Sequence, residues 1–143
     1  MLRAEIKLEI ARPAADVFDY LTDVEKLPEW QASLVSARAE GELGVGMRIV
    51  ERRALLGRQA ETELEVTACE PGHRFALHSV RGPVQLEIDH LLEQDGRSTS
   101  LSVSARAKAS GLLRFAGRAV EARARQELQR DFGRLKAILE REA

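Results

Sequence analysis

Residues 47–66 have the sequence MRIVERRALLGRQAETELEV, in which apolar and charged residues alternate on either side of Leu56-Gly57. This period of two is typical of two half-buried strands joined by a turn. If Leu55 pairs with Arg58, opposite charges face each other on one side of the hairpin. The pairs are Arg48 with Glu65 and Arg52 with Glu61 on the charged side, and Met47 with Val66 and Ile49 with Leu64 on the apolar side. A slip of one residue would move every side chain to the other face, so this register is the one we expect.

The alternation continues to residue 108, with further turn signals at Glu70-Pro71-Gly72, Gly82-Pro83 and Asp95-Gly96. These turns divide residues 47–108 into five strands in hairpin succession. Closing each hairpin at its turn again separates apolar from charged side chains. The expected pairs are Ala68 with Phe75, Glu65 with His78, Arg81 with Val84, His78 with Glu87, Leu77 with Ile88, Gln94 with Arg97, Ile88 with Val103 and Leu86 with Ala105.

The flanking segments complete the pattern. Residues 6–10 alternate like a half-buried strand, and residues 34–40 read as another short strand. Apolar residues at helical spacing predict one short helix over 14–21 and a second over 24–30. Three leucines and a phenylalanine recur at helical spacing near the C-terminus and predict a long amphipathic helix over 112–141. We therefore expect an α+β fold: one strand, two short helices, six strands and a long helix.

Length and composition narrow the class of protein. The chain has 143 residues, with 22 Lys and Arg against 23 Asp and Glu, which suits a single domain over residues 1–143. The near-zero net charge argues against nucleic-acid binding, which needs clustered basic residues for phosphate contacts. The single cysteine, Cys69, falls on the charged face in the pairing above, excludes an intramolecular disulfide and suits a reducing compartment. The first residues resemble neither a signal peptide nor a membrane span, so we expect a cytoplasmic protein.

The apolar face of the predicted sheet also carries polar side chains. The row consists of Glu51, Arg53, Thr62, Ser79 and Arg81, and His90 faces inward at the opposite end of the sheet. In this register Thr62 lies opposite Glu51 and next to Arg81. Charged groups are rarely buried without partners. Either this end of the inner face is open to water, or Glu51 and Arg81 pair inside a polar pocket.

The predicted long helix is uneven along its length. Its C-terminal half offers the large side chains of Leu128, Phe132, Leu135 and Leu139, whereas its N-terminal half offers Ala116, Gly117, Ala119, Val120 and Ala124. The facing strand also contributes Ala105 and Ala107. Because packed interiors do not tolerate large voids, either the helix approaches the sheet closely or a ligand cavity lies between them. The polar row on the inner face favours the cavity.

Several segments resemble a known family. Residues 10–23 (IARPAADVFDYLTD) and 27–30 (LPEW) resemble the opening of the START-like superfamily, typified by the birch-pollen allergen, and more closely its bacterial polyketide cyclase/dehydrase-like (SRPBCC) branch. The Gly44-Val45-Gly46 turn, the Glu65-Val66-Thr67 strand with Glu70-Pro71, and the long terminal helix also match. The resemblance implies a helix-grip fold: a seven-stranded antiparallel sheet wrapped around the C-terminal helix, with two short helices after the first strand and an apolar cavity between.

The resemblance also implies a function. The family binds hydrophobic small molecules such as lipids, sterols and polyketides, some members are cyclases, and there is no universal catalytic motif to carry over. We therefore expect a binding protein for a hydrophobic small molecule, without a cofactor, acting as a monomer or homodimer. The enzyme alternative is a polyketide cyclase or dehydratase in which Glu51 or His90 transfers protons.

The expected ligand-binding residues come from the inner face, the short helices and the start of the long helix. They are Tyr20, Trp30, Glu51, Arg53, Thr62, Ser79, Arg81, His90, Leu112, Phe115 and Val120. Two interpretations of Arg81 stay open: it binds an anionic group of the ligand through its guanidinium fork, or it forms an internal ion pair with Glu51. No metal-ligand spacing occurs in the sequence, so we expect no metal site.

In the topology that the resemblance implies, three segments meet at one end of the cavity. They are residues 55–57, residues 81–83 and residues 111–113 with Phe115, whose apolar side chains predict a hydrophobic gate. The gate residues near Arg114 and Arg118 also suit a peripheral contact with anionic lipid. A third interpretation of the function is that the protein docks to a partner or a membrane through these gate residues.

Overall fold

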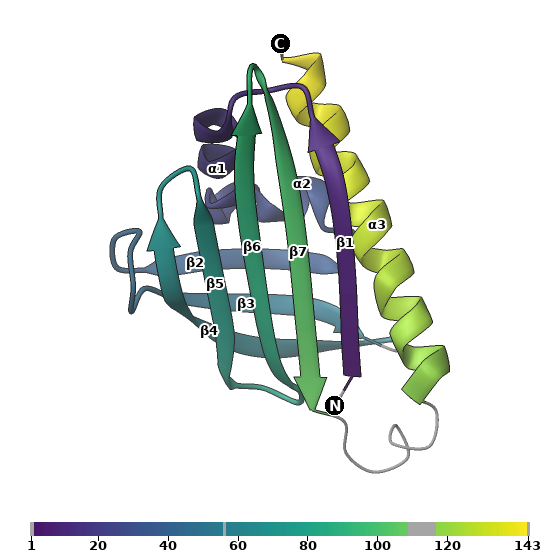
Figure 1. Cartoon of the computed structure of the whole chain (residues 1–143). Coiled ribbons are helices and arrows are strands. Elements are labelled where there is room, and N and C mark those ends of the chain that lie inside the picture. Colours follow the sequence, from purple (N-terminus) through teal and green to yellow (C-terminus); the bar gives the residue numbers. More distant parts are fainter. Residues whose placement is uncertain (1, 56, 109–116, 143) are drawn as a thin grey trace.

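The computed structural model describes residues 2–55, 57–108 and 117–142. Its strands pair antiparallel in a seven-stranded sheet of order β1-β7-β6-β5-β4-β3-β2. The strands are β1 (Leu2–Ile10), β2 (Leu34–Glu40), β3 (Arg48–Leu55), β4 (Arg58–Glu70), β5 (Arg74–Arg81), β6 (Gln85–Asp95) and β7 (Ser98–Lys108). The sheet bends so that β2, β3 and β4 cross behind β6, β7 and β1 (Figure 1). This bend gives the sheet a concave inner face.

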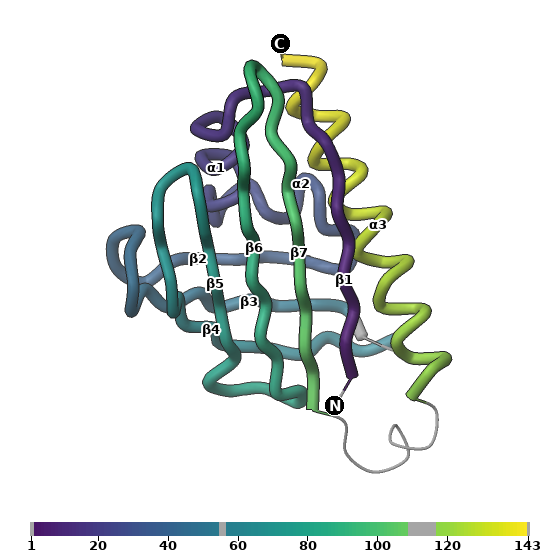
Figure 2. Tube along the Cα trace, viewed as in Figure 1, coloured from purple at the N-terminus to yellow at the C-terminus, as the bar shows by residue number. Residues whose placement is uncertain are grey.

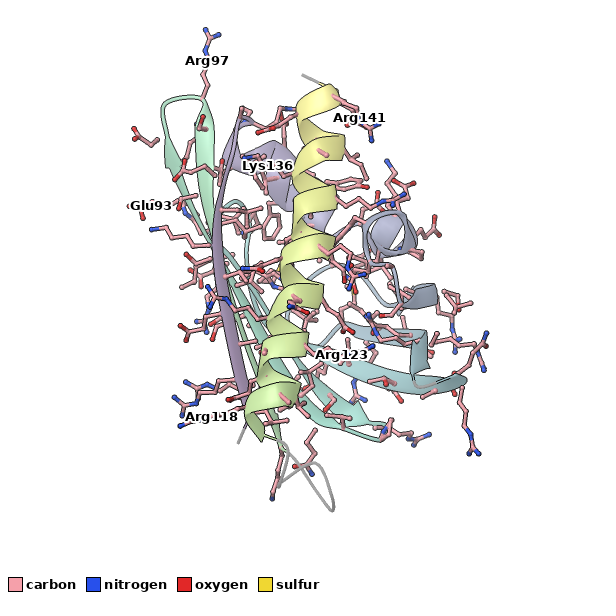
Figure 3. The ribbon with its side chains drawn as sticks, turned by 90° about the vertical axis from the view of Figure 1, so that its right-hand side faces the viewer. Glu93, Arg97, Arg118, Arg123, Lys136 and Arg141 are labelled. Atoms are coloured by element: carbon pink, nitrogen blue, oxygen red, sulfur yellow. The ribbon has the colours of Figure 1, made fainter. Side chains whose placement is uncertain are left out.

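Helices cover that inner face. They are α1 (Ala14–Leu21), the 3-10 turn η1 (Val24–Lys26), α2 (Leu27–Trp30) and the long α3 (Gly117–Arg141). The first helix lies beside the β6–β7 turn, where the backbone N–H of Ala14 donates to Gln94 Oε1 at 2.8 Å (Figure 2). The long helix runs beside β1 and also contacts α1 and α2 (Figure 3). The predicted α+β class and helix-grip architecture are confirmed.

The helical predictions hold with one refinement. The predicted second short helix is a 3-10 turn followed by a single α-helical turn, with Pro28 in its first turn, where a proline costs no backbone hydrogen bond. The predicted start of the long helix at residue 112 lies outside the described residues. None of the described helices is long and apolar enough to cross a membrane.

The register expected from charge pairing is confirmed for the first hairpin and at the centre of the next two strand pairs. Arg48 pairs with Glu65 in the β3–β4 ladder, and its Nε donates to Glu65 Oε2 at 3.0 Å. His78 of β5 pairs with Glu65 of β4 on one side and with Glu87 of β6 on the other. Acidic side chains therefore alternate with an arginine and a histidine across four neighbouring strands on the outer face, as the alternation predicts.

The predicted β6–β7 pairing is wrong by two residues. The observed ladder pairs Ile88 with Ala105 and closes with Asp95 opposite Ser98, instead of Gln94 opposite Arg97. The loop therefore begins at Gly96, which takes the left-handed φ of +63° that glycine adopts without strain. A shift of two residues preserves the faces of both strands, so the apolar side chains still point inward.

Two irregularities in the β4–β5 ladder, one with an extra residue in β4 and one with an extra residue in β5, overturn further details of the predicted register. The ladder shifts between Val66 and Ala68, which places Cys69 instead of Ala68 opposite Phe75. Cys69 consequently packs against the hydrophobic core and not on the charged face, and burial raises the pKa of its thiol. A second shift, between Glu63 and Leu64, pairs Arg81 with Glu63, so the predicted neighbour relationship between Arg81 and Thr62 is also wrong.

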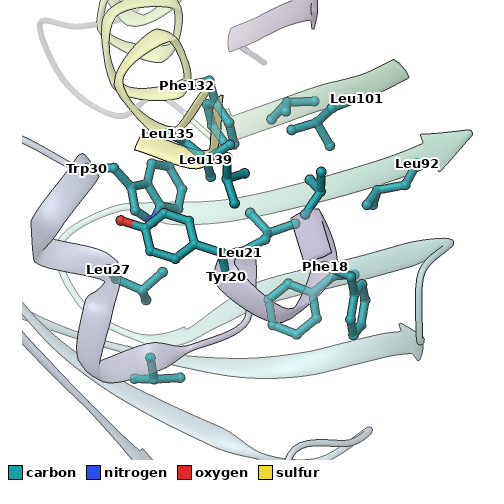
Figure 4. Close-up of a cluster of buried hydrophobic side chains, with 14 of the residues drawn as sticks. Phe18, Tyr20, Leu21, Leu27, Trp30, Leu92, Leu101, Phe132, Leu135 and Leu139 are labelled. Atoms are coloured by element: carbon teal, nitrogen blue, oxygen red, sulfur yellow. The ribbon is translucent and has the colours of Figure 1, made fainter. Parts of the chain in front are cut away.

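The core fills the end of the fold where α1, α2 and the C-terminal half of α3 meet (Figure 4). Trp30 packs against Phe132 with ring centroids 4.8 Å apart, and Leu135 and Leu139 are fully buried beside them. Large side chains thus close this end of the space between sheet and helix. The smaller residues of the N-terminal half of α3 leave the other end for a cavity.

Candidate ligand cavity

A cavity of about 250 Å³ lies between the inner face of the sheet, α2 and α3. Most of its lining is apolar, with Leu64, Phe75 and Ile88 contributed by the sheet and Leu128 and Phe132 by the helix. Concave, mainly apolar cavities with a few polar groups are typical small-molecule sites. The geometry therefore provides a partly open, mainly apolar space in which a ligand can be oriented by a small number of polar contacts.

Small side chains account for the space. Ala105 of β7 and Ala124 of α3 both line the cavity, where a larger residue at either position would occupy part of its volume. The expectation that small residues on facing elements leave room between sheet and helix agrees with this lining. Val120, half-buried one turn earlier on α3, does not line the cavity.

The polar end of the cavity is organised by Arg53. Its guanidinium donates to Ser33 Oγ at 2.8 Å, to Gln31 Oε1 at 2.7 Å and to Glu51 Oε2 at 3.0 Å. These bonds tie β3 to the segment that follows α2. Because three of the five guanidinium N–H groups are engaged in this way, Arg53 is held in one orientation at the cavity wall.

Glu51 is the most deeply buried charge at this end, with 6 % of its surface exposed. Its ion-pair partner is Arg53, two residues along the same face of β3. The predicted internal pair between Glu51 and Arg81 is therefore wrong. Arg81 lies exposed at the end of β5, outside the cavity lining, because the extra residue Val80 in β5 shifts its position.

Two acidic side chains of α3 complete the polar end. Asp131 accepts a hydrogen bond from the backbone N–H of Ala32 at 3.2 Å, and burial raises the pKa of its carboxyl. Glu127, one turn earlier and more exposed, also lines the cavity and pairs with Arg123 across 3.6 Å. The cavity lining thus holds more carboxylates than cations.

His90 lines the cavity from β6 and is 5 % exposed. Its Nδ1 lies 2.8 Å from the backbone oxygen of Phe75, and its ring packs between Phe75 and Phe132 with centroid separations of 5.9 and 5.7 Å. Burial lowers the pKa of its imidazole to about 4, so the ring is neutral at physiological pH. His90 is therefore a neutral polar group set among aromatic rings.

The structure brings together only part of the predicted site. Trp30, Glu51, Arg53 and His90 line the cavity. Tyr20 is buried beside it, and its hydroxyl donates to Glu29 Oε1 at 3.0 Å. Burial and the neighbouring carboxylate of Glu29 raise the pKa of that hydroxyl.

Two predicted residues support the β5–β6 turn instead of the cavity. Ser79 Oγ accepts a hydrogen bond from the backbone N–H of Leu86 at 2.8 Å and donates to the oxygen of Val84 at 3.2 Å. Thr62 packs against Gly82 of the same turn. Leu112 and Phe115 lie outside the described residues, and so does half of the predicted gate, including Leu56 and Leu113.

Sequence reasoning missed Gln31, Ser33 and Asp131. Gln31 and Ser33 follow α2 in an irregular segment, where no periodicity assigns a direction to a side chain. Asp131 had a detectable signal: it lies three residues after Leu128 and next to Phe132, so it borders the apolar face of the helix. Within the described ranges there is no group of three or more His, Cys, Asp or Glu side chains that could hold a metal ion.

Solved structures share this fold across almost the whole chain. A protein from Thermus thermophilus has a TM-score of 0.85 at 13 % identity, with 99 % of each chain covered. A START superfamily protein from Mycobacterium smegmatis has a TM-score of 0.82 at 15 % identity, again with 99 % of each chain covered. The Zhui aromatase/cyclase from Streptomyces has a TM-score of 0.81 at 17 % identity, covering 97 % of this chain and 93 % of that one. At these identities the likeness establishes the fold.

The family is established by the sequence itself. A family model described as polyketide cyclase / dehydrase and lipid transport matches residues 1–140, whereas the comparison with curated proteins finds no match. That family has a hydrophobic-ligand-binding fold, and some of its members are polyketide cyclases. The resemblance to START-like proteins is therefore confirmed. The chain belongs to the polyketide cyclase / dehydrase and lipid transport family.

Proposed function

We propose that the protein binds a small hydrophobic molecule in the cavity between the sheet and α3. The observation that carries this proposal is an apolar cavity of about 250 Å³ with a polar end built around Arg53 and Glu51. Burial of apolar ligand surface supplies affinity, and the polar groups supply orientation. Family membership supports the same class of ligand.

The volume limits the size of that molecule. An apolar cavity of about 150 Å³ accommodates benzene, so a cavity of about 250 Å³ suits a ligand of roughly ten non-hydrogen atoms. One or two fused rings, or a single ring with a short alkyl chain, fit this limit. Among the lipids, sterols and polyketides expected for the family, compact aromatic molecules and short acyl chains suit the cavity best.

The chemistry of the two proton-transfer candidates favours binding over catalysis. Glu51 is held in an ion pair with Arg53. A general base works best when its pKa is near the operating pH, and the imidazole of His90 has a pKa of about 4. His90 is therefore not tuned for proton transfer at neutral pH.

A polyketide cyclase or dehydratase remains the second candidate function, because Glu51 and His90 line the same cavity and a structural neighbour is an aromatase/cyclase. Turnover of an aromatic polyketide precursor by the wild-type protein, lost in Glu51→Gln or His90→Gln, would establish it. Unchanged turnover in both variants would remove both residues from that role.

The binding proposal is tested by native mass spectrometry after gentle purification, together with a thermal-shift screen of compact aromatic compounds and short-chain fatty acids. Trp30, the single tryptophan, lines the cavity and reports binding through its fluorescence. We expect a co-purified or added ligand that changes this emission. A protein that none of these compounds stabilises and that carries no ligand would overturn the proposal.

We also propose that the protein is cytoplasmic and is a monomer or a homodimer. Cell fractionation tests the location, and sedimentation tests the oligomeric state.

A further inference from the structure

The deepest polar contact available to a ligand is made by His90. Its two ring nitrogens have different surroundings. Nδ1 lies 2.8 Å from the oxygen of Phe75, whereas Nε2 has no hydrogen-bond partner among the described residues. Trp30 Nε1, by contrast, is unpartnered and fully covered by protein atoms. Because His90 lines the cavity, Nε2 is the ring atom left for a ligand.

The Phe75 contact determines what Nε2 offers. A backbone carbonyl oxygen only accepts hydrogen bonds, so Nδ1 must carry the hydrogen in this pair. In a neutral imidazole the other nitrogen then lacks a hydrogen and is an acceptor. The ring stays neutral because burial lowers the pKa of His90 to about 4. The cavity wall thus presents a hydrogen-bond acceptor among aromatic rings.

The charges at the polar end disfavour an anion. Three carboxylates, those of Glu51, Glu127 and Asp131, line the cavity together with the guanidinium of Arg53. The guanidinium is already bonded to Glu51 and to the oxygens of Gln31 and Ser33. An added carboxylate would face like charges and would lose its hydration on entry.

We propose that this cavity selects neutral hydrophobic molecules that carry a hydroxyl group, whose O–H donates to His90 Nε2, and that it rejects carboxylates. This inference rests on the proposed binding function and names its ligand class. It replaces the expectation of an anionic group held by Arg81, because Arg81 lies outside the cavity.

The test uses four ligands that share one butylphenyl group and differ only in the para substituent: butylbenzene, para-butylphenol, para-butylanisole and para-butylbenzoate. The anisole keeps the oxygen of the phenol but has no hydrogen to donate. Binding is measured by calorimetry and by Trp30 fluorescence excited where phenols do not absorb. We expect wild-type protein to bind the phenol about tenfold more tightly than the anisole, since one neutral hydrogen bond is gained and one acceptor–acceptor contact is avoided. Binding of the benzoate should be weaker than that of butylbenzene.

Variants assign the preference to His90. In His90→Phe the phenol and the anisole should bind equally, while butylbenzene still binds. If His90→Phe does not fold, His90→Asn serves instead, because its amide N–H can still donate to the Phe75 oxygen while the Nε2 acceptor is removed. The matched control is His73→Phe at an exposed position, which should keep the wild-type preference.

Nitrogen NMR of the imidazole gives an independent readout. The free protein should show the neutral ring with hydrogen on Nδ1, and para-butylphenol should shift the Nε2 resonance. Three results would overturn the inference while leaving the binding function intact. They are a hydrogen on Nε2 in the free protein, equal binding of the phenol and the anisole by wild-type protein, or a preference for the phenol that persists in His90→Phe. If none of the four ligands binds, the proposed function fails first and the inference fails with it.

Discussion

The guanidinium of Arg53 lies 3.0 Å from the carboxylate of Glu51, two residues away on the same face of β3. Adjacent inward positions of one strand thus supply both members of a largely buried ion pair. The pair borders the cavity, so it serves both the stability of the fold and the polarity of the site.

Breaking this pair from the cationic side should be costly. Arg53→Met is expected to lower the free energy of unfolding by about 2–3 kcal/mol, because it leaves a buried carboxylate without its cation. This loss is smaller than for a fully buried pair, because Arg53 is partly exposed. Glu51→Gln should cost less, about 1 kcal/mol, because its amide oxygen still accepts a hydrogen bond. Urea denaturation measures both. Arg52→Met, an exposed change on the outer face, is the control, and an equal loss in that variant would contradict the role of the pair.

The buried imidazole of His90 should make the protein less stable in mild acid. Its pKa falls from about 6.5 in the unfolded chain to about 4 in the folded protein, so only the unfolded state takes up the proton between these values. Stability contributed by the neutral ring is present above pH 6.5 and is lost as the pH falls towards 4. The loss amounts to about 3 kcal/mol.

Unfolding free energies measured across this pH range check the prediction. In His90→Phe the acid-dependent loss should shrink by about that amount, whereas the exposed His73→Phe should retain it. Identical pH profiles for wild-type protein and His90→Phe would show that His90 is not buried in its neutral form.

Two glycines should respond to alanine in opposite directions. Gly82 has a φ of +142°, and an added Cβ would lie 3.0 Å from Thr62 Oγ1, so Gly82→Ala should destabilise the fold by about 1–3 kcal/mol. Gly133 lies exposed within α3 with open space around it, so Gly133→Ala should stabilise by about 0.5–1 kcal/mol. Thermal unfolding of both variants measures the difference, and a destabilised Gly133→Ala would be contrary to this expectation.

The sheet could be predicted closely from the sequence because its outer face pairs opposite charges. Matching Arg48, Glu65, His78 and Glu87 aligned β3 to β6 without any long-range information. The β6–β7 hairpin was placed two residues away because both registers keep the same residues inward. Hydrophobic alternation therefore cannot distinguish the two registers.

The site was harder to predict than the sheet. The irregularities in the β4–β5 ladder carry no distinct sequence signal, yet they move Arg81 away from Thr62 and turn Cys69 inward. As a result Glu51 pairs with Arg53 and not with Arg81. Gln31 reaches the cavity through the packing of α2 and α3 around Trp30 and the sheet, a long-range relationship that no local pattern encodes.

The central claim is that the space between the sheet and α3 is a binding cavity, and Ala124 tests it most directly because it lines that space. Calorimetric titration of butylbenzene should show binding by wild-type protein and by Ala122→Phe, which adds the same side chain at an exposed position of the same helix. Ala124→Phe should stay folded and lose the binding, since its ring occupies the cavity. Undiminished binding by a folded Ala124→Phe would contradict the claim.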